Sequence, residues 1–515
     1  MAAGESPDPV IARLVAADKT PWYKKPNLRY LYLFLVPCCL GIESTSGFDS
    51  SLMNGLQSLS YWQDFFGEPE GAALGILTAS YNLGAITSLP FVPIISDHVG
   101  RRWSIMFGSV VMIVGAIMQA FSVNFTMWVF SRIFLGGHGV VYAIVSGSAL
   151  IGELGHPKER AILGALFNAF YHIGAIIAAG ITLRTLEIQS DWSWRLPSLL
   201  QVAPSLFQIS CIFFIPESPR WLVSKGRNDE ALATLVKYHA EGDVTAELPR
   251  AEFAQIVKAL EIENETRKRG YIELFQTPGM RRRSLITAML GLFTQFSGNT
   301  LISNYLVLIL KSIGITDPWD QNKLNLGNTA WSLVACTILA LTVPRFPRRH
   351  MYMLCVTCLL IIYTCWTITQ ARFVITGSPA AGIAVIVFIF LYAPSYAIGY
   401  NALTYTYLIE LWPFYVRTKG VSWFQLFGRL AGFFGTFVNP IGLKEIEWKY
   451  LLVYVVWLCF EWVFIFFMFP ETNNLTLEEL TFLFESQEER DAIAREAELQ
   501  IEGEKPLPEH TEKVA

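Results

Sequence analysis

Several ionisable residues lie inside stretches that are otherwise apolar, among them Glu43, Asp49, Arg132, His172 and Arg429. A carboxylate at bilayer depth costs about 2.5–3.5 kcal/mol on insertion scales, so such a group is neutral, paired or in contact with water. Arg132 is the obvious partner for Asp49. Protonation of Asp49 would release Arg132, which would couple proton occupancy to a conformational change. The alternatives are a static Asp49–Arg132 ion pair and an aspartate exposed at a loop end.

The other three ionisable residues have less evident roles. Glu43 precedes Asp49 by six residues and is either a second titratable site or a polar contact to another helix. His172 shares a helix face with Asn168, one turn earlier, and serves either packing or, alternatively, pH sensing. Arg429 falls near the middle of an apolar stretch. We expect it to face a cavity or pair with an acid, and an anionic substrate group is one such partner.

Membrane-spanning helices must position these side chains. The chain of 515 residues is 53% hydrophobic and only 16% charged, whereas soluble chains carry about 25% charged residues. A span needs about 20 mostly apolar residues. The sequence predicts an all-α polytopic membrane protein with twelve spans, near 30–53, 72–95, 103–121, 125–148, 162–182, 197–215, 284–311, 328–344, 351–371, 379–408, 420–442 and 450–469.

Two short patterns recur about half a chain apart, each after a long apolar stretch. The first is Pro216–Leu222 (PESPRWL) and the second is Pro470–Glu479 (PETNNLTLEE). A second duplication is an acid followed seven residues later by a base: Glu153 precedes Arg160, and Glu410 precedes Arg417. A repeat at this period indicates two homologous membrane bundles, an arrangement found in many transporters. We therefore expect two six-helix bundles.

The distribution of positive charge predicts the orientation of these bundles. Basic residues occupy alternate connections, at Arg101 and Arg102, Lys158 and Arg160, Arg345 to Arg349, and Arg417 and Lys419. By the positive-inside rule these connections and both tails are cytosolic. We expect cytosolic tails at 1–29 and 470–515, bundles at 30–215 and 284–469, and a cytosolic helical linker at 216–283. The basic runs at 267–269 and 281–283 fit topology anchors better than nucleic-acid contacts.

The eight cysteines all fall in apolar stretches, without metal-ligand spacing or a disulfide framework. No arrangement of Ser, His and Asp residues and no Gly-rich phosphate loop suggests an enzyme. The sequence thus predicts no cofactor, no metal and no nucleic-acid partner, and leaves transport as the function class to examine.

Three motifs together resemble the sugar porter family of the major facilitator superfamily over about residues 28–480. They are Asp97–Arg102 (DHVGRR) and the two repeated patterns, with further matches at Gly47–Asp49, Ser131–Arg132 and Trp194–Pro197. The segments 168–179 and 437–443 look closer to fungal lactose and cellodextrin permeases than to hexose carriers. The resemblance implies that proton-coupled members carry the acid and base found here as Asp49 and Arg132.

The resemblance also implies a cytosolic charge network that gates the two halves, formed here by Asp97, Arg101, Arg102, Glu153, Arg160, Glu410 and Arg417. Each exposed pair contributes about 0.2–1 kcal/mol, so a network can bias a conformational equilibrium without locking it. Pro344–Arg349 (PRFPRR) has proline where the family has Asp and Gly. We expect the network of the second half to lack its acidic partner and its gate to be weaker.

A sugar ring needs amide and hydroxyl partners for its OH groups and aromatic faces for its C–H surfaces. By resemblance, the substrate-binding residues are Asn168, Gln295, Asn299, Thr300, Asn304, Asn401 and Tyr405. Any one of them could instead serve helix–helix hydrogen bonding. Asn168 stands where hexose carriers have Gln, and Tyr405 replaces the usual Trp. These departures leave room for a disaccharide.

The resulting hypothesis is a monomeric, multi-pass plasma-membrane protein that moves a sugar with a proton by alternating access. Uncoupled transport through the same cavity is the first alternative. A sugar sensor with little transport is the second, and export of a metabolite is a weaker one.

Overall fold

The computed structural model describes residues 9–267, 270–412, 416–472 and 484. Every regular element in these ranges is helical, which confirms the all-α prediction. The first half of the chain, here called the N-half, contains α2 (Pro26–Leu56), α3 (Ser60–Phe66), α4 (Gly71–Ser88), α5 (Phe91–Val99), α6 (Arg101–Ala120), α7 (Phe125–Ile133), the π-helix η2 (Phe134–Val140), α8 (Val141–Leu154), α9 (Arg160–Thr185), α10 (Trp192–Leu200) and α11 (Val202–Ile212).

The second half, here called the C-half, repeats this all-helical construction. It contains α15 (Pro278–Phe296), α16 (Asn299–Ser312), α17 (Pro318–Thr342), η4 (Val343–Arg345), α18 (Arg348–Thr376), α19 (Pro379–Tyr396), the π-helix η5 (Ala397–Asn401), α20 (Thr404–Leu411), α21 (Arg417–Ile446), η7 (Glu447–Lys449) and α22 (Tyr450–Met468). Between the halves lie α12 (Pro219–Ser224), α13 (Asn228–His239), α14 (Glu247–Arg267) and η3 (Tyr271–Phe275). Two further elements, α1 (Pro9–Ala17) and η1 (Trp22–Lys24), lie before α2.

Local sequence explains where several helices begin. Proline occupies the first turn of α12, α15 and α17, where its missing N–H costs nothing. Ser218, Thr277 and Asp317 stand just before these prolines, and each side chain accepts a hydrogen bond from a backbone amide of the first turn. Asn124 caps α7 in the same way. Such caps fix the start of a helix by satisfying otherwise unpaired amides.

By length and composition, eight helices of the described residues could cross a membrane: Pro26–Leu56, Arg101–Ala120, Phe125–Leu154, Pro278–Ser312, Pro318–Thr342, Arg348–Thr376, Pro379–Leu408 and Lys419–Met468. The last of these includes both α21 and α22. The predicted spans near 72–95, 162–182 and 197–215 coincide with α4–α5, α9 and α10–α11, which are not among the eight. The total of twelve therefore stays a prediction.

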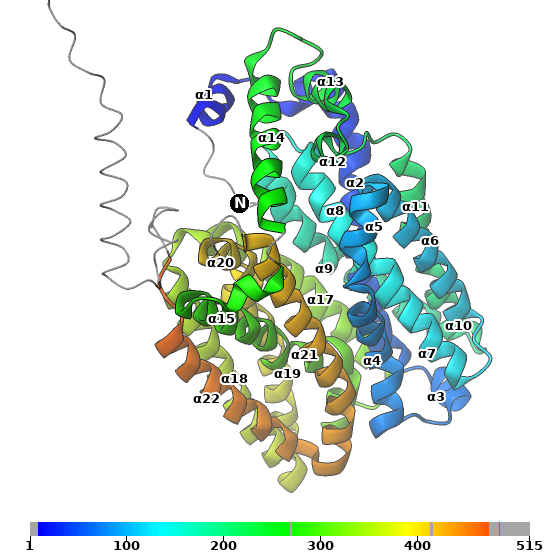
Figure 1. Cartoon of the computed structure of the whole chain (residues 1–515). Coiled ribbons are helices and arrows are strands. Elements are labelled where there is room, and N and C mark those ends of the chain that lie inside the picture. The colour runs from blue at the N-terminus through cyan, green and yellow to red at the C-terminus, as the bar shows by residue number, and fades with distance from the viewer. Residues whose placement is uncertain (1–8, 268–269, 413–415, 473–483, 485–515) are drawn as a thin grey trace, which may run out of the picture.

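Figure 1 shows the N-half helices, blue to teal, gathered beside the C-half helices, green to orange. Across this boundary α4 packs along α21, α9 along α17, and α16 against α2. Helices α1, α13 and α14 lie together at one end of the molecule, here called the linker end (Figure 1). The Glu241 carboxylate, which follows α13, accepts hydrogen bonds from the amides of Asn27 and Leu28 at 2.8 and 3.0 Å. The linker thus caps the start of α2.

Within the N-half, α2 and α9 pack so closely that only glycine fits at two contact points. A Cβ atom at Gly47 would lie 1.8 Å from the carbonyl oxygen of Tyr171, and one at Gly174 would lie 1.8 Å from that of Ser44. The hydroxyl of Ser44 donates a hydrogen bond to the carbonyl of Phe170 at 3.0 Å. This tight pair of helices holds the backbone of Asp49 and its neighbours in place.

Candidate functional site

The structure brings Asp49 of α2 and Arg132 of α7 together as a bidentate ion pair. Both terminal guanidinium nitrogens donate to the two carboxylate oxygens at 3.0 Å. Gln201, between α10 and α11, donates a third hydrogen bond to Asp49 Oδ1 at 3.0 Å. Asp49 is 4% exposed and Arg132 1%. Arg132 also lies over the Tyr81 ring of α4, 5.5 Å from its centroid, so the pair is enclosed by four segments of the N-half.

The candidate substrate residues of the C-half sit around a break between α15 and α16. Gly298 stands at this break with φ of +101°, and a Cβ atom there would meet the hydroxyl of Tyr363. Gln295, the last residue but one of α15, is half-buried, and within the described residues no hydrogen bond holds its side chain. Asn299 accepts a hydrogen bond from Ser303 at 3.2 Å. Of the predicted residues here, Gln295 is therefore the one most available to a ligand.

Two further predicted residues are used in helix packing. Thr300 is 3% exposed, and its hydroxyl accepts a hydrogen bond from Asn439 of α21 at 3.3 Å. Asn304 donates to the carbonyl of Thr300 at 3.1 Å, and its own carbonyl accepts from Gln57, just after α2, at 2.7 Å. In this conformation both residues hold helices together.

The remaining predicted substrate residues differ in how far the structure describes them. Asn401 ends η5 and is half-buried. Tyr405 of α20 is 44% exposed, and its hydroxyl accepts a hydrogen bond from Gln425 of α21 at 2.8 Å. The side chain of Asn168 on α9 lies outside the described residues.

At the end opposite the linker, amide side chains of α2 fasten the two halves. Asn54 donates to the carbonyl of Ser303 at 2.6 Å and accepts from the amide of Leu306 at 2.9 Å. Ser58, two residues after α2, accepts from Asn322 of α17 at 2.6 Å, and Ser51 of α2 accepts from Asn325 of α17 at 3.3 Å. Sequence reasoning missed this closure, although a run of amides in an apolar helix was the available signal.

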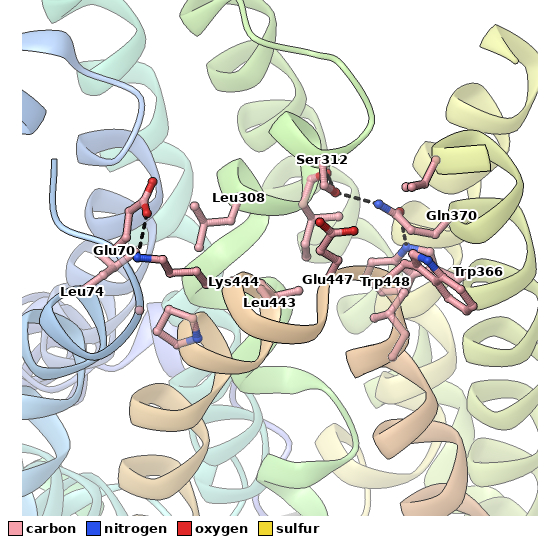
Figure 2. A pocket seen from close by; sticks show the side chains of 15 residues that line it. Glu70, Leu74, Leu308, Ser312, Trp366, Gln370, Leu443, Lys444, Glu447 and Trp448 are labelled. Atoms are coloured by element: carbon pink, nitrogen blue, oxygen red, sulfur yellow. Dashed lines mark hydrogen bonds and ion pairs between the residues drawn. The ribbon is translucent and has the colours of Figure 1, made fainter. Parts of the chain in front are cut away.

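The same end carries a cavity of about 410 Å³ between the halves (Figure 2). Glu70, just before α4, forms an ion pair of 3.1 Å with Lys444 of α21 at its rim. On the other side Gln370 links Ser312 and Trp366, donating to the serine at 2.7 Å and accepting from the indole at 3.3 Å. The cavity lies beyond the closed contacts of α2 and α16.

At the linker end the N-half forms the first part of the predicted charge network. Glu153 lies 3.6 Å from Nε of Arg101 and accepts a hydrogen bond from Ser218 of the first repeated pattern. Glu217 accepts hydrogen bonds from the amides of Arg101 and Arg102 at 3.1 and 3.3 Å. Burial raises the pKa of Glu217, despite these backbone hydrogen bonds and the charge of Arg101.

The C-half forms the equivalent network, which corrects one prediction. Arg348 pairs with Glu410 at 3.0 Å, and Glu410 accepts from Thr472 of the second repeated pattern at 2.5 Å. Glu471 accepts from the amides of Arg348 and Arg349 at 2.8 and 3.1 Å. The prediction that this half lacks an acidic partner is wrong, because Glu410 and Glu471 reach the proline-containing turn from other segments.

The other predicted network residues lie at the same end. Asp97 pairs with Arg101 at 3.3 Å, and Arg102 donates to the carbonyl of Phe213 at 3.1 Å. Arg160 pairs with Glu252 of α14 at 3.5 Å. The Arg417 Nε donates to the carbonyl of Trp412 at 3.4 Å. Between described residues, no ion pair at this end joins one half to the other: the pairs lie within a half, or involve the linker or the residues before α2.

The comparisons with solved structures identify this arrangement. The chain is similar to the xylose transporter XylE from E. coli in a partially occluded inward-open conformation, with a TM-score of 0.72, 19% identity, and coverage of 87% of this chain and 100% of that chain. The proton:xylose symporter XylE bound to a bromodeoxyglucose gives a TM-score of 0.71 at 21% identity, covering 89% and 100% of the two chains. These similarities establish the major facilitator fold.

Curated relatives agree with the fold. The MFS glucose transporter mfs1 of Aspergillus flavus is 28% identical over 469 residues, covering 85% of this chain and 87% of the relative. The high-affinity glucose transporter of Kluyveromyces lactis is 26% identical over 512 residues, covering 92% and 88%. The family model for sugar (and other) transporters matches residues 34–484. The chain therefore belongs to this family of membrane transporters, the sugar porters of the major facilitator superfamily.

Proposed function

We propose that this protein carries a sugar together with a proton across the plasma membrane by alternating access, as a monomer with twelve spans. The observation that carries the proton-coupling part is the buried Asp49–Arg132 pair. A proton that binds Asp49 cancels the attraction between the two side chains. Because the pair joins α2 to α7, its separation would allow these helices to move relative to each other. Relatives named as glucose transporters support a sugar as the substrate.

The contacts between the halves support an inward-facing state, if the linker end is cytosolic as the positive-inside rule predicts. Amides of Asn54 and Gln57 close the opposite end. At the linker end, the ion pairs between described residues do not cross between the halves. In an inward-facing state after proton release, Asp49 is expected to be ionised and paired. The observed bidentate geometry fits that stage of the cycle.

Uncoupled transport is the second candidate function, and one observation favours it. Asp49 accepts three hydrogen bonds at 3.0 Å, two of them from a guanidinium. Hydrogen bonds to the charged form of a carboxylate oppose its protonation. A pair that never takes up a proton would serve only to hold α2 and α7 together, and transport would then be equilibrative.

Uptake of labelled lactose, cellobiose and glucose into a transporter-null yeast strain tests the proposal at pH 5 and pH 7. We expect uptake that is faster at pH 5 and abolished by a protonophore, and Asp49→Asn should equilibrate but not accumulate sugar. Asp320→Asn is the matched control, because Asp320 pairs with Lys323 at an exposed site. Equilibrative uptake that changes neither with pH nor in Asp49→Asn would establish uncoupled transport. No uptake of any sugar, with the protein at the cell surface, would overturn sugar transport.

A further inference from the structure

The helical segment formed by α19, η5 and α20 departs from a regular α-helix at two places. Pro394 in α19 has no amide hydrogen, so the carbonyl of Phe390 lacks its usual donor. Trp331 of α17 donates to that carbonyl instead, at 2.9 Å. In η5 the amide of Ala402 donates to the carbonyl of Ala397, five residues back, at 3.2 Å. A helix with two such breaks depends on its neighbours to hold its direction.

The π-helical turn of η5 decides how two predicted substrate residues face. A π-turn accommodates one extra residue. Each residue after it therefore lies about 100° around the helix axis from its place in an uninterrupted α-helix. Asn401 is the last residue of η5, and Tyr405 follows four residues later in α20. Any contact that holds η5 in its π-helical form thus also holds the orientation of these two side chains.

A buried carboxyl group makes such a contact. Glu461 of α22 is 0% exposed, and it accepts a hydrogen bond from the hydroxyl of Tyr400 in η5 at 2.8 Å. The Tyr400 ring packs against that of Tyr352 in α18, with centroids 5.9 Å apart. A Cβ atom at Gly399 would lie 2.8 Å from the Cβ of Cys355 in α18. The π-turn is therefore packed closely on α18 and tied to α22 by a side-chain hydrogen bond.

Packing alone does not account for an acid at this position. Among the described residues, Glu461 takes part in no ion pair within 4 Å, and a carboxyl group without a cation at membrane depth is costly. A leucine would fill a similar space without that cost. A hydrogen bond, in contrast, is directional, so the carboxyl fixes where the Tyr400 hydroxyl lies. We propose that Glu461 is a positioning residue, which acts through Tyr400 to hold η5 and so to orient Asn401 and Tyr405 for substrate binding.

This inference rests on the proposed sugar transport, and uptake kinetics test it. KM and the maximal rate per transporter at the surface are measured for whichever of glucose, lactose and cellobiose the wild type transports. In Glu461→Leu and Tyr400→Phe we expect KM to rise about threefold to tenfold, as for the loss of one hydrogen bond to substrate. The maximal rate should change little. Glu461→Gln keeps an acceptor oxygen for Tyr400 and should keep the wild-type KM.

The matched control is Trp462→Phe, at the neighbouring position of α22. It removes a hydrogen bond of 3.1 Å from the Trp462 indole to Thr357 of α18, a contact outside η5. We expect this variant to keep the wild-type KM even if its unfolding temperature falls. A rise in KM as large as that of Glu461→Leu would show that any weakening of α22 against α18 raises KM, and would overturn the positioning role.

A double variant separates positioning from stability. Glu461→Leu leaves the buried Tyr400 hydroxyl without an acceptor and should unfold at a lower temperature than wild type. Combined with Tyr400→Phe, it leaves no unsatisfied group, so much of the stability should return. The KM of the double variant should nevertheless stay raised, because no hydrogen bond ties η5 to α22. A double variant that recovered both stability and the wild-type KM would show a purely structural contact.

The remaining outcomes are also decisive. Unchanged KM values in both Glu461→Leu and Tyr400→Phe, with uptake intact, would overturn the inference and leave sugar transport standing. Loss of proton-driven accumulation in Glu461→Gln at the wild-type KM would overturn it as well, because Glu461 would then carry a proton rather than position a helix. Absence of uptake of all three sugars by surface-expressed wild type would overturn both proposals.

Discussion

Glu217 and Glu471 occupy equivalent places at the starts of α6 and α18. Each carboxylate accepts hydrogen bonds from two successive backbone amides, those of Arg101 and Arg102 in the N-half and those of Arg348 and Arg349 in the C-half. The residue that follows each glutamate, Ser218 or Thr472, donates to the acid of the same half's network, Glu153 or Glu410. The repeated sequence patterns therefore form the same cap twice.

Removal of either cap should destabilise its own half. In Glu471→Ala, two amides of α18 lose their acceptor and the favourable interaction of a carboxylate with the helix N-terminus. We expect a loss of about 0.5–2 kcal/mol, the range for helix caps, and a similar loss in Glu217→Ala. Thermal unfolding of purified protein measures both. Glu230→Ala on α13, an exposed acid paired with Arg227, is the control; a control that unfolds as early as the cap variants would contradict the capping role.

The fold class and the identities of the network acids could be predicted from apolar stretches and repeated motifs, since both are local features of the sequence. The caps were harder to predict from the sequence because each joins residues more than 100 positions apart, as Glu471 joins Arg348. The prolines at 344 and 347 suggested a weakened turn, yet Glu410 reaches Arg348 from a separate helix. Distant partners of this kind follow from helix packing, which single-sequence patterns do not encode.

The Asp49–Arg132 pair was easier to predict from the sequence than the amide contacts between the two halves. An isolated Asp49 in an apolar helix demands a cation, and Arg132 offered one. Asn54 and Gln57 carry no charge, so their position in the sequence did not distinguish contacts between the halves from contacts within one. The contribution of Gln201 to Asp49 was equally hidden, because an amide before a helix has many plausible partners.

Substitution of either member of the Asp49–Arg132 pair alone should strongly destabilise the folded protein. In Arg132→Gln the buried carboxylate loses its cation, and breaking a buried pair typically costs about 3–5 kcal/mol. The double variant Asp49→Asn with Arg132→Gln removes both charges. We expect it to unfold at a higher temperature than Arg132→Gln alone. Thermal unfolding of wild type, both single variants and the double variant completes the cycle, and additive losses would show that the two side chains act independently.

Close packing of α2 against α9 should make one glycine of α9 sensitive to substitution and another tolerant. A methyl group at Gly174 would collide with the carbonyl of Ser44, whereas one at Gly180 meets no atom within 4 Å. Overpacking of this kind typically costs about 1–3 kcal/mol, so Gly174→Ala should lower the unfolding temperature and the yield of folded protein. Gly180→Ala should match or exceed wild type, since alanine favours helices. Equal behaviour of the two variants would contradict the packing of α2 on α9.

The attachment of the linker to the N-half should weaken in acid. His239 of α13 contacts Glu252 of α14 at 2.6 Å and the carbonyl of Leu154 at 3.2 Å. Burial alone would raise the pKa of Glu252, but attraction to His239, their hydrogen bond and the charge of Arg160 outweigh it and lower the pKa below 4.5. A lowered pKa adds stability that is present above the unfolded value and is lost as pH falls through the folded value.

Hydrogen exchange of the α13 and α14 peptides at pH 7 and near pH 4, corrected for intrinsic rates, measures this attachment. Wild type should lose protection in both helices on acidification. Glu252→Gln should start with less protection and change less with pH, because the group that titrates is gone. Glu230→Gln, an exposed change on α13, should behave as wild type. If Glu252→Gln kept the full acid response, another carboxylate near the linker would have to be the titrating group, with Asp18 and Glu159 beside His156 the next to test.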